Sequence, residues 1–325
     1  MAGHTLRSAL IDKDKQACYD IVSSKLVGQS LIGVIHEMIL ASISVIYDGK
    51  LMLHPVCVIN SIKNFIGDNR HDPSISLMRF AIDYLFEFDL RNNDSSTLDD
   101  IVKNGLGDTV FVGDLEDACQ NSDWEKAEAI MSKTFLASDR SRATLDTLIE
   151  LALQNAPTHA IFVYHILRSY QFQESKNENW TFIKCVFEQI SSNGLDNAHA
   201  SIETSPSDIR ENVIQNGDVV YFSAIDNIWN GEYVRSRGYK RELSYWLSKI
   251  TLKGSSKIEL LDGHFLKDQE NLSFTMMAQK IINKEKTQQE KAQDLVILEA
   301  VRSLSKITNK QEILYLGSRF NYLAL

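Results

Sequence analysis

The chain has 325 residues, of which 44% are hydrophobic and 24% charged, so it can bury a substantial core. Its formal net charge of −9 disfavours a nucleic-acid partner, because phosphate binding depends on clustered lysine and arginine side chains. With 15 glycines and 4 prolines, few positions force a turn or break a helix. This composition predicts an all-α protein built as a multi-helical array or bundle.

The most apolar segment, residues 31–47, lies in the first third of the chain. It is interrupted by His36 and Glu37 and is too short to span a bilayer comfortably, so we expect a core helix and no membrane partner. His36 is interpreted as a core histidine with a satisfied hydrogen bond; the alternative is a residue of a substrate-binding pocket wall. The first residues lack the apolar stretch of a secretory signal, which predicts a cytoplasmic protein.

The chain shows internal similarity. Residues 6–26 align without a gap with residues 115–135, and an apolar helix and then a helix beginning at a histidine are expected after each. A more diverged third set begins at Phe222. These similarities predict three diverged helical repeats of about 105 residues. The expected units are residues 1–110, 111–215 and 216–325, together forming one continuous structural domain.

Three histidines, His54, His159 and His264, occupy similar positions in the three units and are spaced by 105 residues. If the helices that they begin surround a common axis, the three imidazoles converge on one pocket. In the alternative, each ring caps or packs against the start of its own helix. No H-E-x-x-H or E-x-x-H pattern accompanies them, so we expect no metal site.

Residues 262–272, DGHFLKDQENL, are the most polar of the three histidine segments. They predict a helix start with Asp262 as its N-cap and with His264 and Lys267 on one face. Glu270 follows Lys267 by three residues and is expected to pair with it. A carboxylate beside an imidazole raises its basicity, as a general base requires. The alternative is a solvated, salt-bridged helix start.

One basic stretch, residues 233–242, contains Arg235, Arg237, Lys240 and Arg241. We interpret it as a solvated face of a helix and turn, the alternative being a site for phosphate or another anionic ligand.

Short motifs in residues 54–88, 158–170 and 262–271 resemble those of questin oxidase-like proteins. The last segment is similar to their D-x-H-x-x-K-x-x-E motif, which is matched here by Asp262, His264, Lys267 and Glu270. Asn271 departs from the family, in which an apolar residue commonly follows the glutamate. The resemblance implies an all-helical fold and an oxidoreductase of aromatic polyketides that uses NADPH and oxygen.

Two classes of function follow. The first is an oxidoreductase of a bulky organic substrate, bound in a pocket between the helical units. The second is a non-catalytic helical-repeat scaffold, or a protein that binds a small ligand on a concave face. In the enzyme, the expected catalytic residues are His264, Lys267 and Asp262. The residues expected to contact the substrate are His54, His159, Glu270 and His36. Apart from the NADPH implied by the resemblance, no cofactor is indicated, and a small-molecule ligand is the expected partner.

Overall fold

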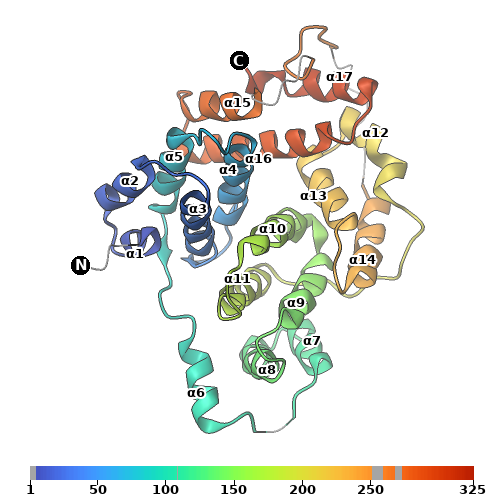
Figure 1. Ribbon diagram of the computed structural model, residues 1–325. Helices are drawn as coiled ribbons and strands as arrows, with labels where there is room; N and C mark the ends of the chain where they lie inside the picture. The colour runs from blue at the N-terminus through green and yellow to red at the C-terminus, as the bar shows by residue number, and fades with distance from the viewer. Residues whose placement is uncertain (1–4, 108, 251–258, 268–272) are drawn as a thin grey trace.

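The computed structural model describes residues 5–107, 109–250, 259–267 and 273–325 (Figure 1). Within these ranges the chain is mostly helical, and its β-structure is one antiparallel pair of two-residue strands, β1 (Val45–Ile46) and β2 (Asp89–Leu90). The predicted all-α fold is confirmed. None of the helices in the described ranges has both the length and the apolar composition needed to cross a bilayer.

In the first third of the chain, apolar residues at helical spacing form helices whose buried faces share one core. These helices are α1 (Leu6–Ile11), α2 (Lys15–Ser23), α3 (Gln29–Ser42), α4 (Pro55–Asp68), α5 (Ile75–Leu85) and α6 (Ser96–Asn104). The apolar segment 31–47 contributes the buried helix α3 and then strand β1, in agreement with the expectation of a core helix.

The second third likewise begins with a short helical hairpin and an apolar helix, which are followed by two further helices. Its elements are α7 (Val112–Gln120), α8 (Trp124–Ala137), α9 (Ala143–Leu153), α10 (Ala156–Ser169), the 3₁₀ turn η1 (Tyr170–Phe172) and α11 (Glu178–Asn193). In both thirds, the first helix of the hairpin packs on the following apolar helix, α1 on α3 and α7 on α9.

The α1–α2 and α7–α8 hairpins have the same turn, as their gap-free alignment leads one to expect. Each turn contains a residue with left-handed backbone, Lys13 (φ 56°) in the first and Ser122 (φ 58°) in the second. The next residue, Asp14 or Asp123, caps the second helix with its carboxylate. Its amide donates a 2.9 Å hydrogen bond back to the first helix in both hairpins. The internal similarity is therefore structural between these two parts.

The third part is built differently. Its elements are α12 (Pro206–Asn216), α13 (Val219–Trp229), α14 (Ser236–Ser248), α15 (Ser273–Ile282), α16 (Gln288–Ser305), α17 (Lys310–Arg319) and the 3₁₀ turn η2 (Asn321–Leu323). Helix α12 crosses the expected boundary at 215/216, with all but its last residue before it, yet it packs on α13 and α17. A third copy of the repeat is not confirmed, and the three-unit division stays a prediction.

Four helices from all three parts form the centre of the molecule. Helix α4 packs on α10, α10 on α13, α13 on α16, and α16 on α4, so the four close into a ring (Figure 1). We refer to them as the central ring. Because its members come from distant parts of the sequence, the ring brings together side chains that no local pattern connects.

Candidate functional site

Polar side chains from three helices of the central ring meet at its centre. Glu299 of α16, which is 1% exposed, accepts a 2.6 Å hydrogen bond from Asn64 of α4. Its carboxylate also lies 3.4 Å from the hydroxyl of Tyr164 of α10 and 3.2 Å from the guanidinium of Arg302. Arg302 in turn donates two hydrogen bonds of 2.5 Å to Asp68 at the end of α4. We call these residues the central network.

Opposite charges hold the central network together against the cost of burial. Burial raises the pKa of Glu299, and the charge of Arg302 opposes this shift. Burial lowers the pKa of Arg302, but its bonds to Asp68 and the charge of Glu299 outweigh burial and raise that pKa above its ordinary value. Removing one partner would leave a buried charge without its counter-charge. We therefore expect the loss of any one member of the network to destabilise the ring.

Two further titratable side chains lie beside the central network. His165 of α10 is 2% exposed, and its Nδ1 accepts a 2.8 Å hydrogen bond from the side-chain amide of Asn60. Burial, together with the charge of Lys63, lowers the pKa of His165 to about 3, so the imidazole is neutral with its proton on Nε2. Burial, with the charge of Arg168, lowers the pKa of Lys63 to about 7. A partly neutral amine of this kind can accept a proton or act as a nucleophile.

A cavity of about 810 Å³ lies next to the central ring, between segments from all three parts of the chain. Small-molecule sites have volumes of roughly 300–1,000 Å³. The cavity's apolar wall consists of Met52, Leu53, Ile161, Val219, Val220, Ile250, Val296, Ile297 and Phe320. Such a wall favours an apolar ligand, because binding removes apolar surface from water. We call this space the apolar cavity.

The charged side chains of the apolar cavity are already bonded to helix ends. The guanidinium of Arg319 donates to carbonyls at and just after the end of α12, including bonds of 3.0 and 2.8 Å. The carboxylate of Asp218 accepts hydrogen bonds of 2.9 and 3.0 Å from amides in the first turn of α13. Hydrogen bonds thus occupy both groups, and the guanidinium of Arg319 faces the carbonyls of a helix C-terminus rather than a carboxylate.

One layer of apolar side chains separates the apolar cavity from the central network. Ile161, Val220 and Val296 line the apolar cavity on one side and a small void of about 10 Å³ on the other. The void also touches the polar residues Tyr164, His165, Ser223 and Glu299. Acid–base groups thus lie directly behind an apolar wall.

His54, expected to contact substrate, caps α4 and does not line the apolar cavity. Its Nδ1 accepts the amide of Val56 at 3.2 Å, and its Nε2 lies 3.6 Å from the sulfur of Cys185. The ring also meets Phe162 edge-on, with a distance of 4.9 Å between ring centres. Burial lowers the pKa of His54 to about 3. These contacts favour the alternative in which the histidine caps and packs its own helix.

His159 also packs within the helical core. It is the fourth residue of α10 rather than its first, and it is 0% exposed. Its Nε2 lies 3.1 Å from the carbonyl of Gly194 at the end of α11 and donates to it. Its Nδ1 is buried without a hydrogen-bond partner within the described part of the chain. Burial lowers the pKa of His159. The apolar cavity is lined not by this histidine but by Ile161, two residues later.

The segment around His264 corrects the prediction of a helix start. Residues 262–267 form turns, and the next helix, α15, begins after them. The amide of His264 bonds to the carbonyl of Leu261, and the amide of Lys267 to the carbonyl of His264, so each bond closes a four-residue turn. Asp262 therefore does not cap a helix, and His264 and Lys267 do not share a helical face.

The imidazole of His264 is 6% exposed and packs against α17. Its Nδ1 accepts the amide of Leu266 at 3.2 Å, as His54 does from the residue two positions on. Gly317 of α17 lies so close that a Cβ added there would be 2.1 Å from this nitrogen. Neither His264 nor Asp262 nor Lys267 lines the apolar cavity, and Glu270 lies outside the described residues. Their catalytic and binding roles stay predictions.

His36 is a core histidine with a partner. It is 8% exposed, and its Nε2 lies 3.0 Å from the carboxylate of Glu178. Burial raises the pKa of Glu178, but hydrogen bonds from the amide of Glu174 and from His36 outweigh burial and hold it below its usual value. This arrangement agrees with the interpretation of a satisfied core residue, and His36 does not line the apolar cavity.

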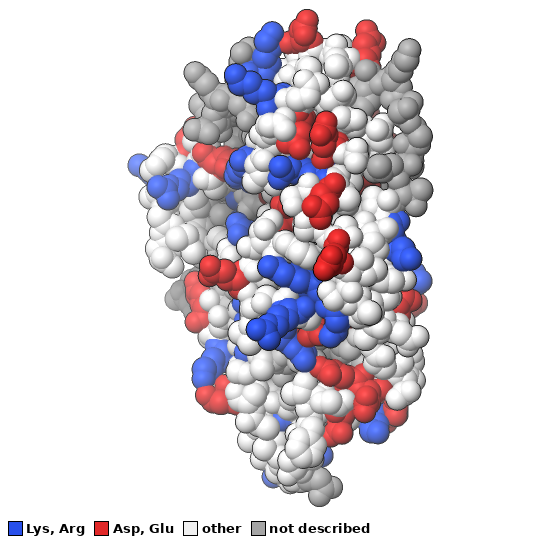
Figure 2. Space-filling view, turned by 90° about the vertical axis from the view of Figure 1, so that its right-hand side faces the viewer, with Lys and Arg blue, Asp and Glu red and all other residues white. Residues whose placement is uncertain are grey.

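The basic stretch 233–242 lies at α14, and two of its arginines are paired with acids. Arg235 lies 2.8 Å from Glu116 and 2.9 Å from Glu150. Arg241 lies 3.0 Å from Glu150 and 2.8 Å from Glu242. On the right-hand face of the molecule, basic side chains gather at mid-height with acidic ones directly beside them (Figure 2). The pairing favours a solvated charged face over an anion site.

The sequence gives a weak indication of the central network and no indication of the apolar cavity. Asn64, Glu299 and Arg302 are polar residues on otherwise apolar helical faces, and a buried polar residue needs a partner. The sequence does not show which distant helix supplies that partner. The cavity wall consists of the same residue types as the core. The sequence therefore does not distinguish the residues that line the cavity from those that are buried, and only the packing of the folded chain does so.

Comparisons of this chain with protein families, with curated proteins and with solved structures each found no match. The resemblance to questin oxidase-like proteins therefore stays a prediction. Among the described residues, no group of three or more His, Cys, Asp or Glu side chains is arranged to hold a metal ion.

The NADPH that this resemblance implies does not fit the apolar cavity. Its phosphates need free cationic groups or a free helix N-terminus. Arg319 is bonded to backbone carbonyls, and the carboxylate of Asp218 occupies the N-terminus of α13. A phosphate there would meet a negative charge instead of open donors.

Proposed function

We propose that the protein binds a bulky, mainly apolar organic molecule in the apolar cavity. The observation that carries this proposal is a space of about 810 Å³ with a mainly apolar wall, whose charged residues are bonded to helix ends. A ligand that covers such a wall gains roughly 25 cal/mol for each Å² of apolar surface removed from water. Polar metabolites would lose their hydration without finding free charged partners.

The walls of the apolar cavity are suited to holding a ligand in a fixed position. Helices α10, α13 and α16 belong to the central ring, and each supplies one or more residues to the wall. Side chains carried on packed helices keep their positions better than side chains on loops, which reduces the ordering cost of binding.

Titration with Nile red, a neutral apolar dye, tests this proposal. We expect saturable binding with an increase in dye fluorescence. Ile297→Trp, which fills the cavity from α16, should weaken binding at least tenfold, whereas Ile307→Trp should not. Ile307 follows α16, is 44% exposed and does not line the cavity, so it is the matched control. Equal affinity of the two variants would overturn the proposal, provided that both melt at the wild-type temperature.

An oxidoreductase acting on the bound molecule is the second candidate. It is supported by Tyr164, His165 and Glu299, which lie one side-chain layer behind the apolar wall, and by the resemblance of residues 262–271. Its test is consumption of an aromatic polyketide under air, measured with and without NADPH. We expect Ile297→Trp to abolish consumption and Ile307→Trp to preserve it. An inactive wild-type protein that still binds the polyketide would leave ligand binding as the function.

A further inference from the structure

A second cleft, of about 460 Å³, lies at the end of the molecule formed by α6 and α8. It is lined by the end of α6 and the loop after it, by α8 and the turn that follows it, and by residues just before and at the start of α11. It shares no lining residue with the apolar cavity. Any ligand of this cleft would therefore be independent of the function proposed above.

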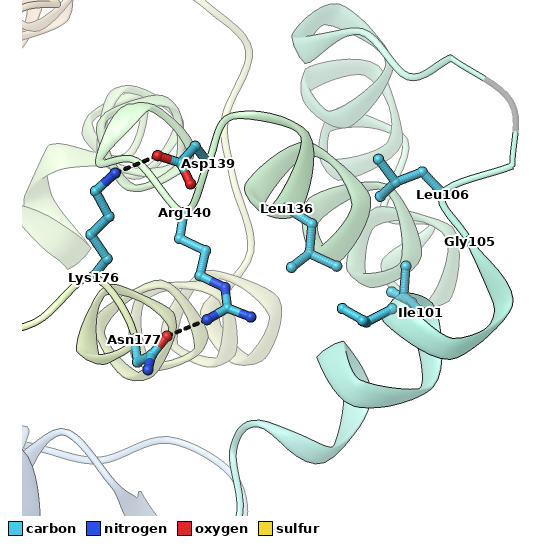
Figure 3. A pocket seen from close by; sticks show the side chains of 9 residues that line it. Ile101, Gly105, Leu106, Leu136, Asp139, Arg140, Lys176 and Asn177 are labelled. Carbon is cyan, nitrogen blue, oxygen red and sulfur yellow. Dashed lines mark hydrogen bonds and ion pairs between the residues drawn. The ribbon is translucent and has the colours of Figure 1, made fainter.

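The two walls of this cleft differ in chemistry (Figure 3). One wall presents the apolar side chains of Ile101, Leu106 and Leu136, and Leu106 is 40% exposed. The facing wall presents Asp139, Arg140, Lys176 and Asn177. A ligand that fills the space would need an apolar body and a polar or charged end.

The polar wall carries a positive charge that is not neutralised. Lys176 forms an ion pair with Asp139, and Asp139 is the acidic residue among those that line this wall. Arg140 donates instead to the neutral side-chain amide of Asn177, at 2.5 Å. In the described ranges, no carboxylate oxygen lies within 4.0 Å of its guanidinium. Since a guanidinium has five N–H donors, several remain open to an anion.

A second hollow, of about 390 Å³, lies on the other side of Arg140 and contains Asp94, Asp99 and Glu178. Asp94 is paired with Arg91 at 2.8 Å, and Glu178 is hydrogen-bonded to the imidazole of His36 at 3.0 Å. Asp99 lies in the first turn of α6, where the helix dipole favours a negative charge. Asp94 and Glu178 therefore have partners of their own, and in the described part of the chain none of the three acids forms an ion pair with Arg140.

The turn after α8 fixes the position of Arg140. Asp139 and Arg140 both have left-handed backbone, with φ 55°, a conformation that is unfavourable for residues other than glycine. A 2.9 Å hydrogen bond from the amide of Arg140 to the carbonyl of Phe135 holds the turn. The side chain of Asn179 donates a second 2.9 Å bond to the carbonyl of Arg140. The backbone that carries the guanidinium is thus set before a ligand arrives.

We propose that this cleft binds an organic carboxylate with an apolar body, such as a medium-chain fatty acid. The carboxylate accepts two hydrogen bonds from Arg140, in the two-point geometry that a guanidinium offers. The chain covers Ile101, Leu106 and Leu136 on the facing wall.

The test is a titration of the ¹⁵N-labelled protein with octanoate, compared with octan-1-ol, which has the same chain and no charge. We expect octanoate to shift the amide signals of Ile101, Leu136 and Arg140 and to bind about tenfold or more tightly than the alcohol. Arg140→Gln should weaken octanoate binding about tenfold and leave the alcohol unaffected. Arg140→Lys, which keeps the charge and loses the two-point geometry, should fall between Gln and wild type.

Two control variants locate the binding. Arg237→Gln removes an exposed arginine of α14 and should change nothing. Ile297→Trp fills the apolar cavity and should leave octanoate binding intact. The proposal is overturned if Arg140→Gln binds octanoate like wild type, if the alcohol binds equally well, or if the shifted signals surround the apolar cavity. Because Ile297→Trp separates the two sites, this result and the Nile red result can fail independently.

Discussion

Ile161, Val220 and Val296 separate two regions of opposite chemistry. On one side, the central network buries charged groups and satisfies them with one another, so that Glu299, 1% exposed, has three partners. On the other side, the apolar cavity is lined by side chains of the types found in the core, and no other protein side chains fill the space between them. Folding accounts for the first region, because the network joins three helices of the central ring. The second region has no such role in holding helices together, and a ligand that covered it would remove apolar surface from water.

This difference separates structural from functional residues. A buried ion pair stabilises a fold only while it is complete, so the perturbed pKa of Glu299 needs no catalytic explanation. An apolar wall beside them needs a ligand or a partner. The variants below perturb one region at a time, and each result should be confined to that region.

Glu299→Ala should have the largest effect. It removes the carboxylate that Asn64, Tyr164 and Arg302 share, and it leaves the charge of Arg302 partly uncompensated. We expect a loss of about 3–5 kcal/mol in the free energy of unfolding, measured by urea denaturation. Glu285→Ala, an exposed glutamate just before α16, should cost almost nothing. Equal losses in both variants would show that the central network does not hold the ring together.

Lys63→Met should stabilise the protein. Burial lowers the pKa of Lys63 to about 7, so the folded chain gives up this proton more readily than the unfolded one, whose lysine has a pKa of about 10.4. Stability of the wild type therefore rises from about pH 7 to about pH 10. We expect the variant to gain about 2–4 kcal/mol at pH 7 and less at pH 10. A gain in the free energy of unfolding that is the same at pH 7 and pH 10 would contradict the interpretation of Lys63 as a buried, partly charged amine.

Gly317→Ala tests the packing at the edge of the apolar cavity. Helix α17 supplies Arg319 to that cavity, while Gly317 faces the ring of His264. A methyl group there would lie 2.1 Å from Nδ1 of His264, so the histidine or the helix must shift. We expect a loss of about 1–3 kcal/mol by thermal denaturation. Combining it with His264→Ala should recover part of the loss, and a double variant that recovers nothing would contradict this contact.

The pH dependence of stability tests the buried imidazole of His165. Its pKa is about 3 in the folded protein and about 6.5 in the unfolded chain, so between these values the unfolded chain binds more protons. Stability is therefore complete above about pH 6.5 and falls with decreasing pH by about 1.4 kcal/mol per unit for this residue. His165→Gln should reduce the slope measured by urea denaturation near pH 5. His71→Gln, in the exposed turn after α4, should leave the slope unchanged.

The sequence predicts helices and local turns better than it predicts the site. The apolar segment 31–47 identifies α3, and the alignment of residues 6–26 with 115–135 anticipates two similar turns. The segment at 262–267 misleads, because the same residues that suit a helix N-terminus also close successive turns. In the folded chain His264 also contacts Gly317 of α17, and the local sequence pattern contains no information on that contact.

The histidine pattern does not identify the polar side chains that meet in the central ring. Equal spacing suggests one shared site, but His54 and His159 each bond within the packing of α4, α10 and α11. Asn60 and His165, which do meet, lie on two helices that only the folded chain brings together. Pairs of this kind depend on which helices are neighbours in the central ring. The local spacing of residues in a single sequence does not show which helices those are.

A crystal structure of the protein grown with Nile red would test the central claim most directly. The account predicts dye density in contact with Ile161, Val220 and Ile297, and no density in the Ile297→Trp protein under the same conditions. Ordered dye at another surface, with the apolar cavity filled by protein side chains, would contradict it.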